Sequence, residues 1–183
     1  MKRSKSIKLA LMGVSVLALT ACDQPDEAAA IFESVDECAK FEGFELEQCR
    51  TNWETAEVEH VRTAPKYTDI ADCQADFGEA QCEQAPQKTS SGGSVFMPMM
   101  MGYMMGSMLS GGGRSNVATQ PLYRSKDDPK NFRTGDNKKV SGKTGISKVA
   151  SSTARAPSTK TSTIRRGGFG STAARSGMRS FGG

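Results

Sequence analysis

The sequence predicts a small, mostly α-helical domain stapled by disulfides, followed by an apolar segment rich in Met and Gly and a largely disordered basic tail. Three observations favour this fold class. Apolar side chains recur at helical spacing through residues 45–63. Four cysteines lie between residues 38 and 82. Residues 114–183 consist largely of Ser, Thr, Gly, Ala, Lys and Arg, a composition that buries too little apolar surface to offset the chain entropy lost on folding.

Residues 1–21 have the features of a secretory signal. The first eight residues carry four Lys or Arg and no acid, and residues 9–19 form a mostly apolar run that is too short to span a bilayer. The run closes with Leu19-Thr20-Ala21-Cys22, which resembles the lipobox of bacterial lipoprotein precursors. In that pattern Cys22 receives a diacylglyceryl group and becomes the acylated amino terminus. We therefore expect Cys22 to anchor the chain, since several acyl chains give stable membrane attachment.

Residues 22–30 are predicted to form the lipid anchor and a short polar tether, in which Pro25 disfavours helix. Asp23, directly after Cys22, resembles the signal that keeps lipoproteins of enteric bacteria in the inner membrane. We therefore expect a cell-membrane protein that is lipid-anchored and faces the periplasm, with the inner membrane favoured over the outer.

Residues 31–85 are predicted to fold into an acidic helical domain. Ser34 and Glu37 form a capping box for a short helix, which we expect to end near Phe41. A second helix over 45–63 ends before Pro65, because the residue preceding a proline is disfavoured in helical conformation. A third short helix is expected to begin at Thr68 or Asp69, to run to about Phe77 and to stop at Gly78.

Cys38, Cys49, Cys73 and Cys82 are the candidate disulfide cysteines of this domain. A weak internal repeat of about 35 residues, each unit closing with Gln-Cys, favours pairing Cys38 with Cys49 and Cys73 with Cys82. The other pairings remain open. A metal site is not favoured, because the cysteines lack the close spacing of zinc ligands and the chain has one histidine.

Residues 86–113 comprise a Ser/Gly spacer and an apolar segment with seven of the ten methionines. Three interpretations compete: contact with a membrane or a partner protein, burial against the disulfide domain, and a Cu(I) site built from thioethers. Contact is favoured because flexible Met side chains suit adaptable binding surfaces, and Cu(I) binding is the alternative function. The expected contact residues are Phe96, Met97, Met100, Met101, Tyr103 and Met104.

The charge of the chain is strongly polarised. Residues 23–88 carry 17 acids and 5 bases, a net charge of −12, whereas residues 114–183 carry 15 bases and 3 acids, a net charge of +12. Such asymmetry indicates an electrostatic partner or attraction between the two halves. An anionic lipid, lipopolysaccharide, a cell-wall polymer or an envelope protein would suit a secreted chain, and nucleic acid would not. The expected anionic-surface residues are Arg165, Arg166, Arg175 and Arg179.

No catalytic set is apparent in the sequence. Residues 111–113 are three glycines without the Lys and Ser/Thr of a phosphate-binding loop, and His60 is expected on a helix face rather than as a catalytic base. We expect no cofactor and no metal. The sequence therefore predicts a non-enzymatic interaction or scaffold protein at the periplasmic membrane surface.

Several short motifs together resemble the uncharacterised YgiB family of proteobacterial envelope proteins, over most of the mature chain. The family has no assigned activity, so the resemblance supports the architecture and implies no catalytic residue. The motifs are Thr63-Ala-Pro-Lys-Tyr67, Asp72-Cys73, Phe77-Gly-Glu79, Gln81-Cys82, Met97-Pro98, Gly102-Tyr-Met-Met-Gly106, Gln120-Pro-Leu122 and Arg166-Gly-Gly-Phe-Gly170.

Overall fold

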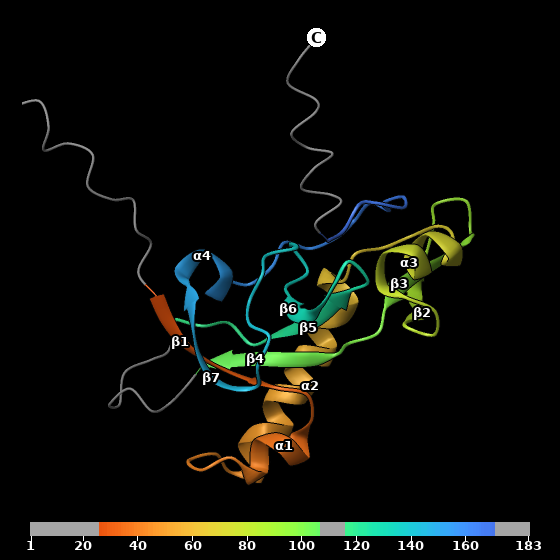
Figure 1. The fold of residues 1–183 in the computed structure, drawn as a ribbon. Helices are drawn as coiled ribbons and strands as arrows, with labels where there is room; N and C mark the ends of the chain where they lie inside the picture. Colours follow the sequence, from red (N-terminus) through yellow and green to blue (C-terminus); the bar gives the residue numbers. More distant parts are fainter. Residues whose placement is uncertain (1–25, 107–115, 171–183) are drawn as a thin grey trace, which may run out of the picture.

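The computed structural model describes residues 26–106 and 116–170 (Figure 1). A five-stranded antiparallel sheet in the order β6-β5-β4-β1-β7 forms the centre of the molecule, and β2 and β3 form a separate hairpin. The strands are β1 (Asp26–Phe32), β2 (Cys82–Lys88), β3 (Ser94–Pro98), β4 (Gly102–Gly106), β5 (Gln120–Ser125), β6 (Asp128–Arg133) and β7 (Gly145–Ala150), and the helices are α1 (Val35–Lys40), α2 (Leu46–Thr63), α3 (Ile70–Phe77) and α4 (Ser151–Ala154).

Strand β1 lies in the interior of the sheet, between β4 and β7. Ala29 pairs with Gly106 on one side and with Ser147 on the other, and the last four residues of β1 are buried. The strand begins at Asp26, five residues before the folded part that the sequence predicts.

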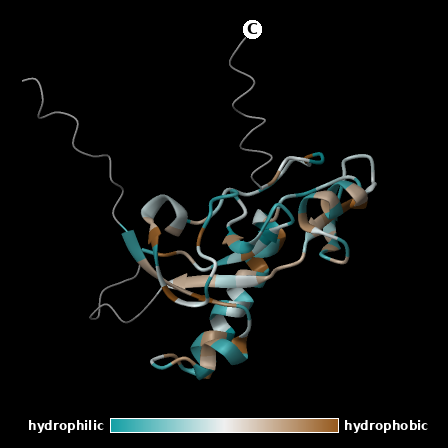
Figure 2. Ribbon diagram, in the orientation of Figure 1, coloured by the Kyte–Doolittle hydropathy of each residue, from teal (hydrophilic) through white to brown (hydrophobic). Residues whose placement is uncertain are grey.

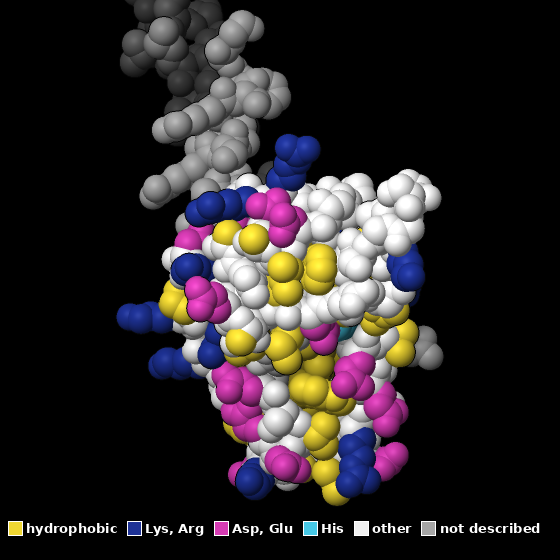
Figure 3. All heavy atoms as spheres, turned by 90° about the vertical axis from the view of Figure 1, so that its right-hand side faces the viewer, with side chains coloured by type: hydrophobic (Ala, Val, Ile, Leu, Met, Phe, Trp, Pro, Cys, Tyr) yellow, Lys and Arg dark blue, Asp and Glu magenta, His cyan; other side chains and the backbone are white. Residues whose placement is uncertain are grey.

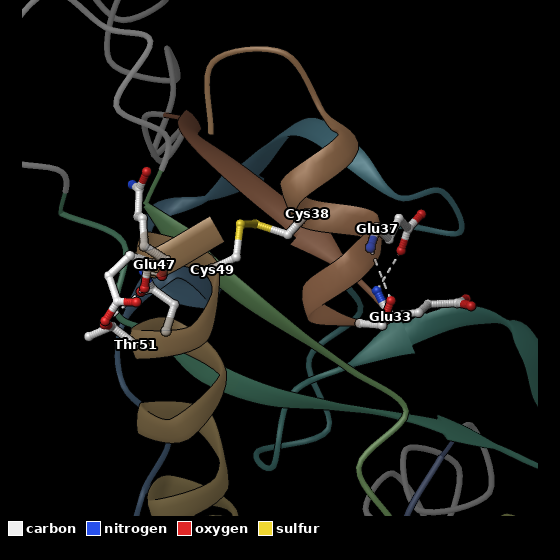
Figure 4. The surroundings of a disulfide bond; sticks show 9 residues. Glu33, Glu37, Cys38, Glu47, Cys49 and Thr51 are labelled. Carbon is white, nitrogen blue, oxygen red and sulfur yellow. Dashed lines mark hydrogen bonds between the residues drawn. A yellow bond between two sulfur atoms is a disulfide. The ribbon is translucent and has the colours of Figure 1, made fainter. Parts of the chain in front are cut away.

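The three predicted helices are confirmed. Ser34 caps α1, because its Oγ accepts a hydrogen bond from the Glu37 N–H at 3.1 Å, and the Glu37 carboxylate accepts from the Glu33 N–H at 2.7 Å (Figure 4). Asp69 caps α3 by accepting from the Ala71 N–H at 2.8 Å. Each helix begins and ends within about a residue of the expected bounds, since capping and proline effects are local.

Both favoured disulfides are confirmed. Cys38 bonds to Cys49 and joins α1 to α2 (Figure 4), and Cys73 bonds to Cys82 and joins α3 to β2. Each bond closes a short loop, with sequence separations of 11 and 9 residues. In the chain-entropy model, loops of this size contribute about 3 kcal/mol each to stability.

Three apolar clusters form the core. The first lies between α3, the β2–β3 hairpin and residues 164–169, and includes Tyr67, Phe77, Tyr123 and Phe169. The second lies on one face of the main sheet, around Leu122. The third lies on the opposite face, where β1 and β4 pack against α1 and α2.

The expectation of a mostly helical fold is wrong, because the apolar Met/Gly segment forms strands. Strand β4 is buried on both faces: Tyr103 and Met105 pack in the third cluster, and Met104 packs in the second. A strand buried on both faces has no alternation of polar and apolar residues, so its sequence resembles a continuous apolar run.

The expectation of a largely disordered basic tail is also wrong for residues 116–170, the part of the tail that the structure describes. Strands β5, β6 and β7 all belong to the main sheet. Their apolar residues are few and stand among hydrophilic ones (Figure 2), yet Leu122, Tyr123, Phe132 and Val149 are each 3% exposed or less. A segment with few apolar residues can fold here because each of its apolar side chains packs in a core shared with distant segments.

Among the described residues, none of the helices is both long enough and apolar enough to cross a membrane. Cys22 and the predicted signal lie outside these residues.

Candidate anion-binding groove

A groove of about 500 Å³ lies where three segments from distant parts of the chain meet. They are the end of α2 with its following loop, the turn that joins β2 to β3, and residues 159–163, which belong to a segment over 155–170 that we call the strap. Of the described residues that line this basic groove, four are cationic, five carry a hydroxyl and none is acidic. The lining residues are Val61, Arg62, Lys66, Gln87, Lys88, Thr89, Ser90, Val95, Thr159, Lys160, Thr161 and Thr163.

The strap contributes its residues in alternation. Thr159, Thr161 and Thr163 line the basic groove alone, Ser162 and Ile164 line a neighbouring cavity of about 330 Å³, and the long side chain of Lys160 lines both. A period of two is typical of an extended chain, in which successive side chains point to opposite sides. The spacing Thr-x-Thr-x-Thr in the sequence is therefore the signal that could have indicated this site.

Backbone hydrogen bonds hold the strap against the end of α2. The Lys160 N–H donates to the Arg62 carbonyl at 2.8 Å, and the Ile164 N–H donates to the Lys66 carbonyl at 2.6 Å. The Asp136 carboxylate accepts from the Ser158 hydroxyl and from the Lys160 ammonium, both at 2.5 Å. The strap thus has a defined register on α2.

The end of the strap is fixed by a buried aromatic ring. Phe169 is 3% exposed and its ring centroid lies 4.8 Å from that of Phe77. The Gly167 N–H donates to the buried Asp76 carboxylate at 2.8 Å. Gly170 has a φ of +83°, and a Cβ there would collide with the Asp127 carboxylate, so this turn requires glycine.

Lys66 is the buried cation of the groove, with an exposed fraction of 6%. Its ammonium donates to the Val61 carbonyl at 2.9 Å and to the Ala64 carbonyl at 3.4 Å, which places a positive charge at the carboxyl end of α2. Burial lowers the pKa of Lys66 from its ordinary value, and the nearby charge of Lys160 lowers the pKa further. An anion in the groove would relieve this repulsion.

The four groove cations differ in whether a carboxylate lies close enough to neutralise them. Lys160 pairs with Asp136, and Arg62 pairs with Glu59 at 2.6 Å. Within the described part of the chain, Lys66 and Lys88 have no carboxylate partner. Asp and Glu side chains gather mainly on the lower half of the face in Figure 3, on the side of α1. Lys66 and Lys88 therefore give the basic groove a local excess of positive charge.

His60 belongs to a hydrogen-bonded chain rather than to the groove, and in this chain His60 and Tyr123 are buried while Glu83 is exposed. Its Nε2 lies 2.9 Å from Glu83 Oε1 and its Nδ1 lies 2.8 Å from the Tyr123 hydroxyl. Burial raises the pKa of Tyr123 well above its ordinary value, so the phenol stays protonated and donates to Nδ1 while Nε2–H donates to Glu83. Both ring nitrogens are thereby occupied, and the arrangement links α2, β2 and β5.

The six residues expected to contact a membrane or a partner lie in β3, in β4 and in the turn between them. Three are 3% exposed or less, and the other three are partly buried against the apolar clusters. Burial within the domain, one of the three interpretations of this segment, is what the structure shows for the first three. These three fully buried residues cannot contact a membrane while the domain is folded. The fully buried residues are Met97, Tyr103 and Met104, and the partly buried ones are Phe96, Met100 and Met101.

The arrangement of the methionines gives no support to a Cu(I) site. Met97 packs in the first cluster, Met104 in the second and Met105 in the third, so these thioethers are divided among separate cores. Nor do the described residues include any group of three or more His, Cys, Asp or Glu side chains that could hold a metal ion.

The expected anionic-surface arginines are divided between two regions. Arg165 and Arg166 are exposed and follow the groove-lining part of the strap directly, between the Ile164 contact and the Phe169 anchor. Arg175 and Arg179 lie outside the described residues. Sequence reasoning missed Lys66, Lys88, Lys160 and the three strap threonines, because the groove forms only when the strap meets α2 and the hairpin.

Comparison with known proteins gives a consistent result. The UPF0441 protein of Erwinia tasmaniensis is 38% identical over 91% of this chain and 81% of its own length. The UPF0441 protein of Serratia proteamaculans is 38% identical over 94% of this chain and 83% of its own length, and one from Pectobacterium carotovorum is 39% identical over 91% and 80%. No solved structure matches the chain.

A family model described as a protein of unknown function, DUF1190, matches residues 26–179. The match begins at the first residue of β1 and extends past the strap, so it includes every segment that lines the basic groove. The expected resemblance to an uncharacterised family is confirmed. The chain belongs to the DUF1190 family.

Proposed function

We propose that this protein is a non-enzymatic, lipid-anchored module of the bacterial envelope that binds an anionic component in its basic groove. The observation that carries the binding proposal is the lining of the groove. Of the described residues that line it, four are cations and none is an acid. A groove of about 500 Å³ is within the usual range for ligand sites.

The anchoring part of the proposal rests on the lipobox at Cys22. Strand β1 begins only four residues later, at Asp26, and four extended residues span at most about 14 Å. A lipidated Cys22 would therefore hold the folded domain close to the membrane surface, on its periplasmic side. Asp23 favours the inner membrane.

Metabolic labelling tests the anchor. Cells that express the chain are grown with radiolabelled palmitate, and the protein is compared with a Cys22→Ser variant. Label is expected on the parent chain and not on the variant. Equal labelling of the two, or no label on either, would contradict the lipid anchor.

Binding of a polyanion tests the groove. The full-length protein, held in vesicles of neutral phosphatidylcholine, is titrated with polygalacturonate and with uncharged dextran. Polygalacturonate should bind and dextran should not, and the affinity should fall with rising salt because exposed charges are screened. Lys88→Gln should weaken binding about tenfold, since it removes a charged hydrogen-bond donor.

A charge at the other end of the molecule provides the matched control. Lys148 is exposed on β7, where it pairs in register with Ala28, and it does not line the groove. Lys148→Gln changes the net charge by the same amount and should leave the affinity unaltered. If the two variants lose affinity equally, the interaction depends on net charge alone and the groove is not the site. Deletion of residues 114–183 would not serve as a test, because it removes β5, β6 and β7.

A further inference from the structure

We infer that the groove ligand is an anionic saccharide chain reached from the periplasmic side, and not the headgroups of the membrane that carries the anchor. This inference rests on the proposed function, because it names the ligand of the same groove and uses the same anchor.

The hydroxyl groups of the groove indicate a saccharide. Thr159, Thr161 and Thr163 line the groove, and none of their hydroxyls hydrogen-bonds to another described residue. A hydroxyl both donates and accepts, so it matches the hydroxyls of a sugar, whereas a simple inorganic anion needs donors alone.

The spacing of these hydroxyls indicates a chain rather than a single small anion. Alternate residues of an extended segment are roughly 6.5 Å apart, so the three threonines form a row along one wall of the groove. Ser90, from the turn after β2, lines the same groove, whereas the neighbouring Thr89 hydroxyl already accepts from the Gly93 N–H. A ligand with hydroxyls on successive units could use the whole row.

The cations indicate that this chain is anionic. The Lys66 ammonium has three protons, of which two are donated to the Val61 and Ala64 carbonyls. Within the described ranges the third has no acceptor, and Lys88 has no ion-pair partner. Both side chains line the groove, where a carboxylate or phosphate on the saccharide would accept their protons.

The position of the groove indicates from which side the ligand arrives. The start of β1, the end of β7 and α4 lie at one end of the molecule, whereas α3 and the β2–β3 hairpin lie at the other (Figure 1). The groove is built by that hairpin, the end of α2 and the strap. An anchor within about 14 Å of Asp26 draws the first end to the bilayer, so the groove faces away from it.

The first experiment separates saccharide recognition from simple anion binding. The full-length protein in phosphatidylcholine vesicles is titrated with polygalacturonate and with sodium polyphosphate, which lacks sugar hydroxyls. Thr161→Val keeps the shape of an exposed side chain and should weaken polygalacturonate binding about fivefold, the scale of one neutral hydrogen bond, while polyphosphate affinity stays within twofold. Lys88→Gln should weaken both ligands.

The outcomes distinguish the two proposals. If Lys88→Gln weakens polygalacturonate binding and Thr161→Val does not, saccharide recognition is wrong and the anion-binding function stands. If neither variant has an effect, the groove is not the site and the proposed function fails with it.

The second experiment tests the orientation of the domain. A photocrosslinking amino acid is placed at position 148 or at position 161 of the lipidated protein in vesicles that contain phosphatidylglycerol. Lipid adducts are expected from position 148 and not from position 161. Adducts from position 161 would show that the groove reaches the bilayer and would overturn the inference.

Discussion

The two disulfide units of this protein differ in what completes them. The Cys38–Cys49 unit joins α1 to α2, and its core draws on β1, α1, α2 and β4. The Cys73–Cys82 unit joins α3 to β2, but its core needs Tyr123 of β5 and Phe169 at the end of the strap. The first unit packs mainly within the N-terminal half of the chain, whereas the second is closed only by distant residues. The basic groove lies in the Cys73–Cys82 unit, so we expect the groove to form only when the strap is in place.

The largest expected effect follows from removing the strap anchor. Phe169→Ala should lower the free energy of unfolding by about 3–5 kcal/mol, the usual cost of truncating a buried Phe, and should abolish polygalacturonate binding. Urea denaturation measures the stability.

Phe41→Ala in the other unit is the control, because Phe41 is 38% exposed. Its cost should be about 1 kcal/mol, with binding retained. Equal losses from the two variants would show that the strap is not a special dependency of the second unit.

Removal of each disulfide should have a similar effect on stability and a different effect on binding. Cys38→Ser with Cys49→Ser, and Cys73→Ser with Cys82→Ser, should each destabilise the fold by about 3 kcal/mol, because the closed loops are of similar length. Only the second pair of substitutions should also weaken polygalacturonate binding. A comparable loss of binding from the first pair would contradict the separation of the two units.

The buried carboxylate of Asp76 tests the link between strap and α3. It accepts hydrogen bonds from the Tyr67 hydroxyl at 2.9 Å and from the Gly167 N–H at 2.8 Å. Asp76→Asn should cost about 1–3 kcal/mol, because an amide cannot accept both bonds as strongly and one buried donor is left poorly paired. Glu42→Gln, on an exposed loop, should change the stability little. Equal unfolding midpoints for the two variants would argue against the link.

The smallest effect is a pH dependence centred on His60. Burial lowers the pKa of His60 below its ordinary value of 6.5, although Glu83 opposes this shift. The unfolded chain therefore binds the proton more readily, so stability is full above about pH 6.5 and is lost as the pH falls towards the folded-state pKa, by at most about 1.4 kcal/mol per pH unit.

His60→Gln removes this titration. The stability advantage of the parent protein over His60→Gln should be smaller at pH 5.5 than at pH 8, as measured by urea denaturation at both values. An advantage that is constant or larger at pH 5.5 would contradict the assignment of a lowered pKa.

How far the sequence predicts this structure depends on whether the signal is local. The caps at Ser34 and Asp69 and the helix end before Pro65 depend on near neighbours, and those helices were predictable. Strand β4 was not, because it is apolar on both faces. The strands after residue 116 were not either, because their few apolar residues gain burial only from partners far along the chain.

The candidate site shows the same limit. Cys38, Cys49, Cys73 and Cys82 were predictable from an internal repeat, since each pair closes a short loop. The groove residues come from α2, the hairpin and the strap; the Thr-x-Thr-x-Thr spacing marks the strap alone, and no local pattern relates the three segments to one another. The turn after β6 approaches the end of α2 closely at Gly135, where a Cβ would collide with the Thr63 carbonyl. This contact depends on a glycine more than 70 residues away from α2 in the chain.

Amide hydrogen exchange of the full-length protein, with and without polygalacturonate, tests whether the basic groove is the ligand site. Ligand in the groove should slow exchange in residues 87–90 and 159–163 and leave residues 26–28 and 148–150 unchanged. Slower exchange confined to the end around the start of β1, or no change at the strap, would contradict a ligand site in the basic groove.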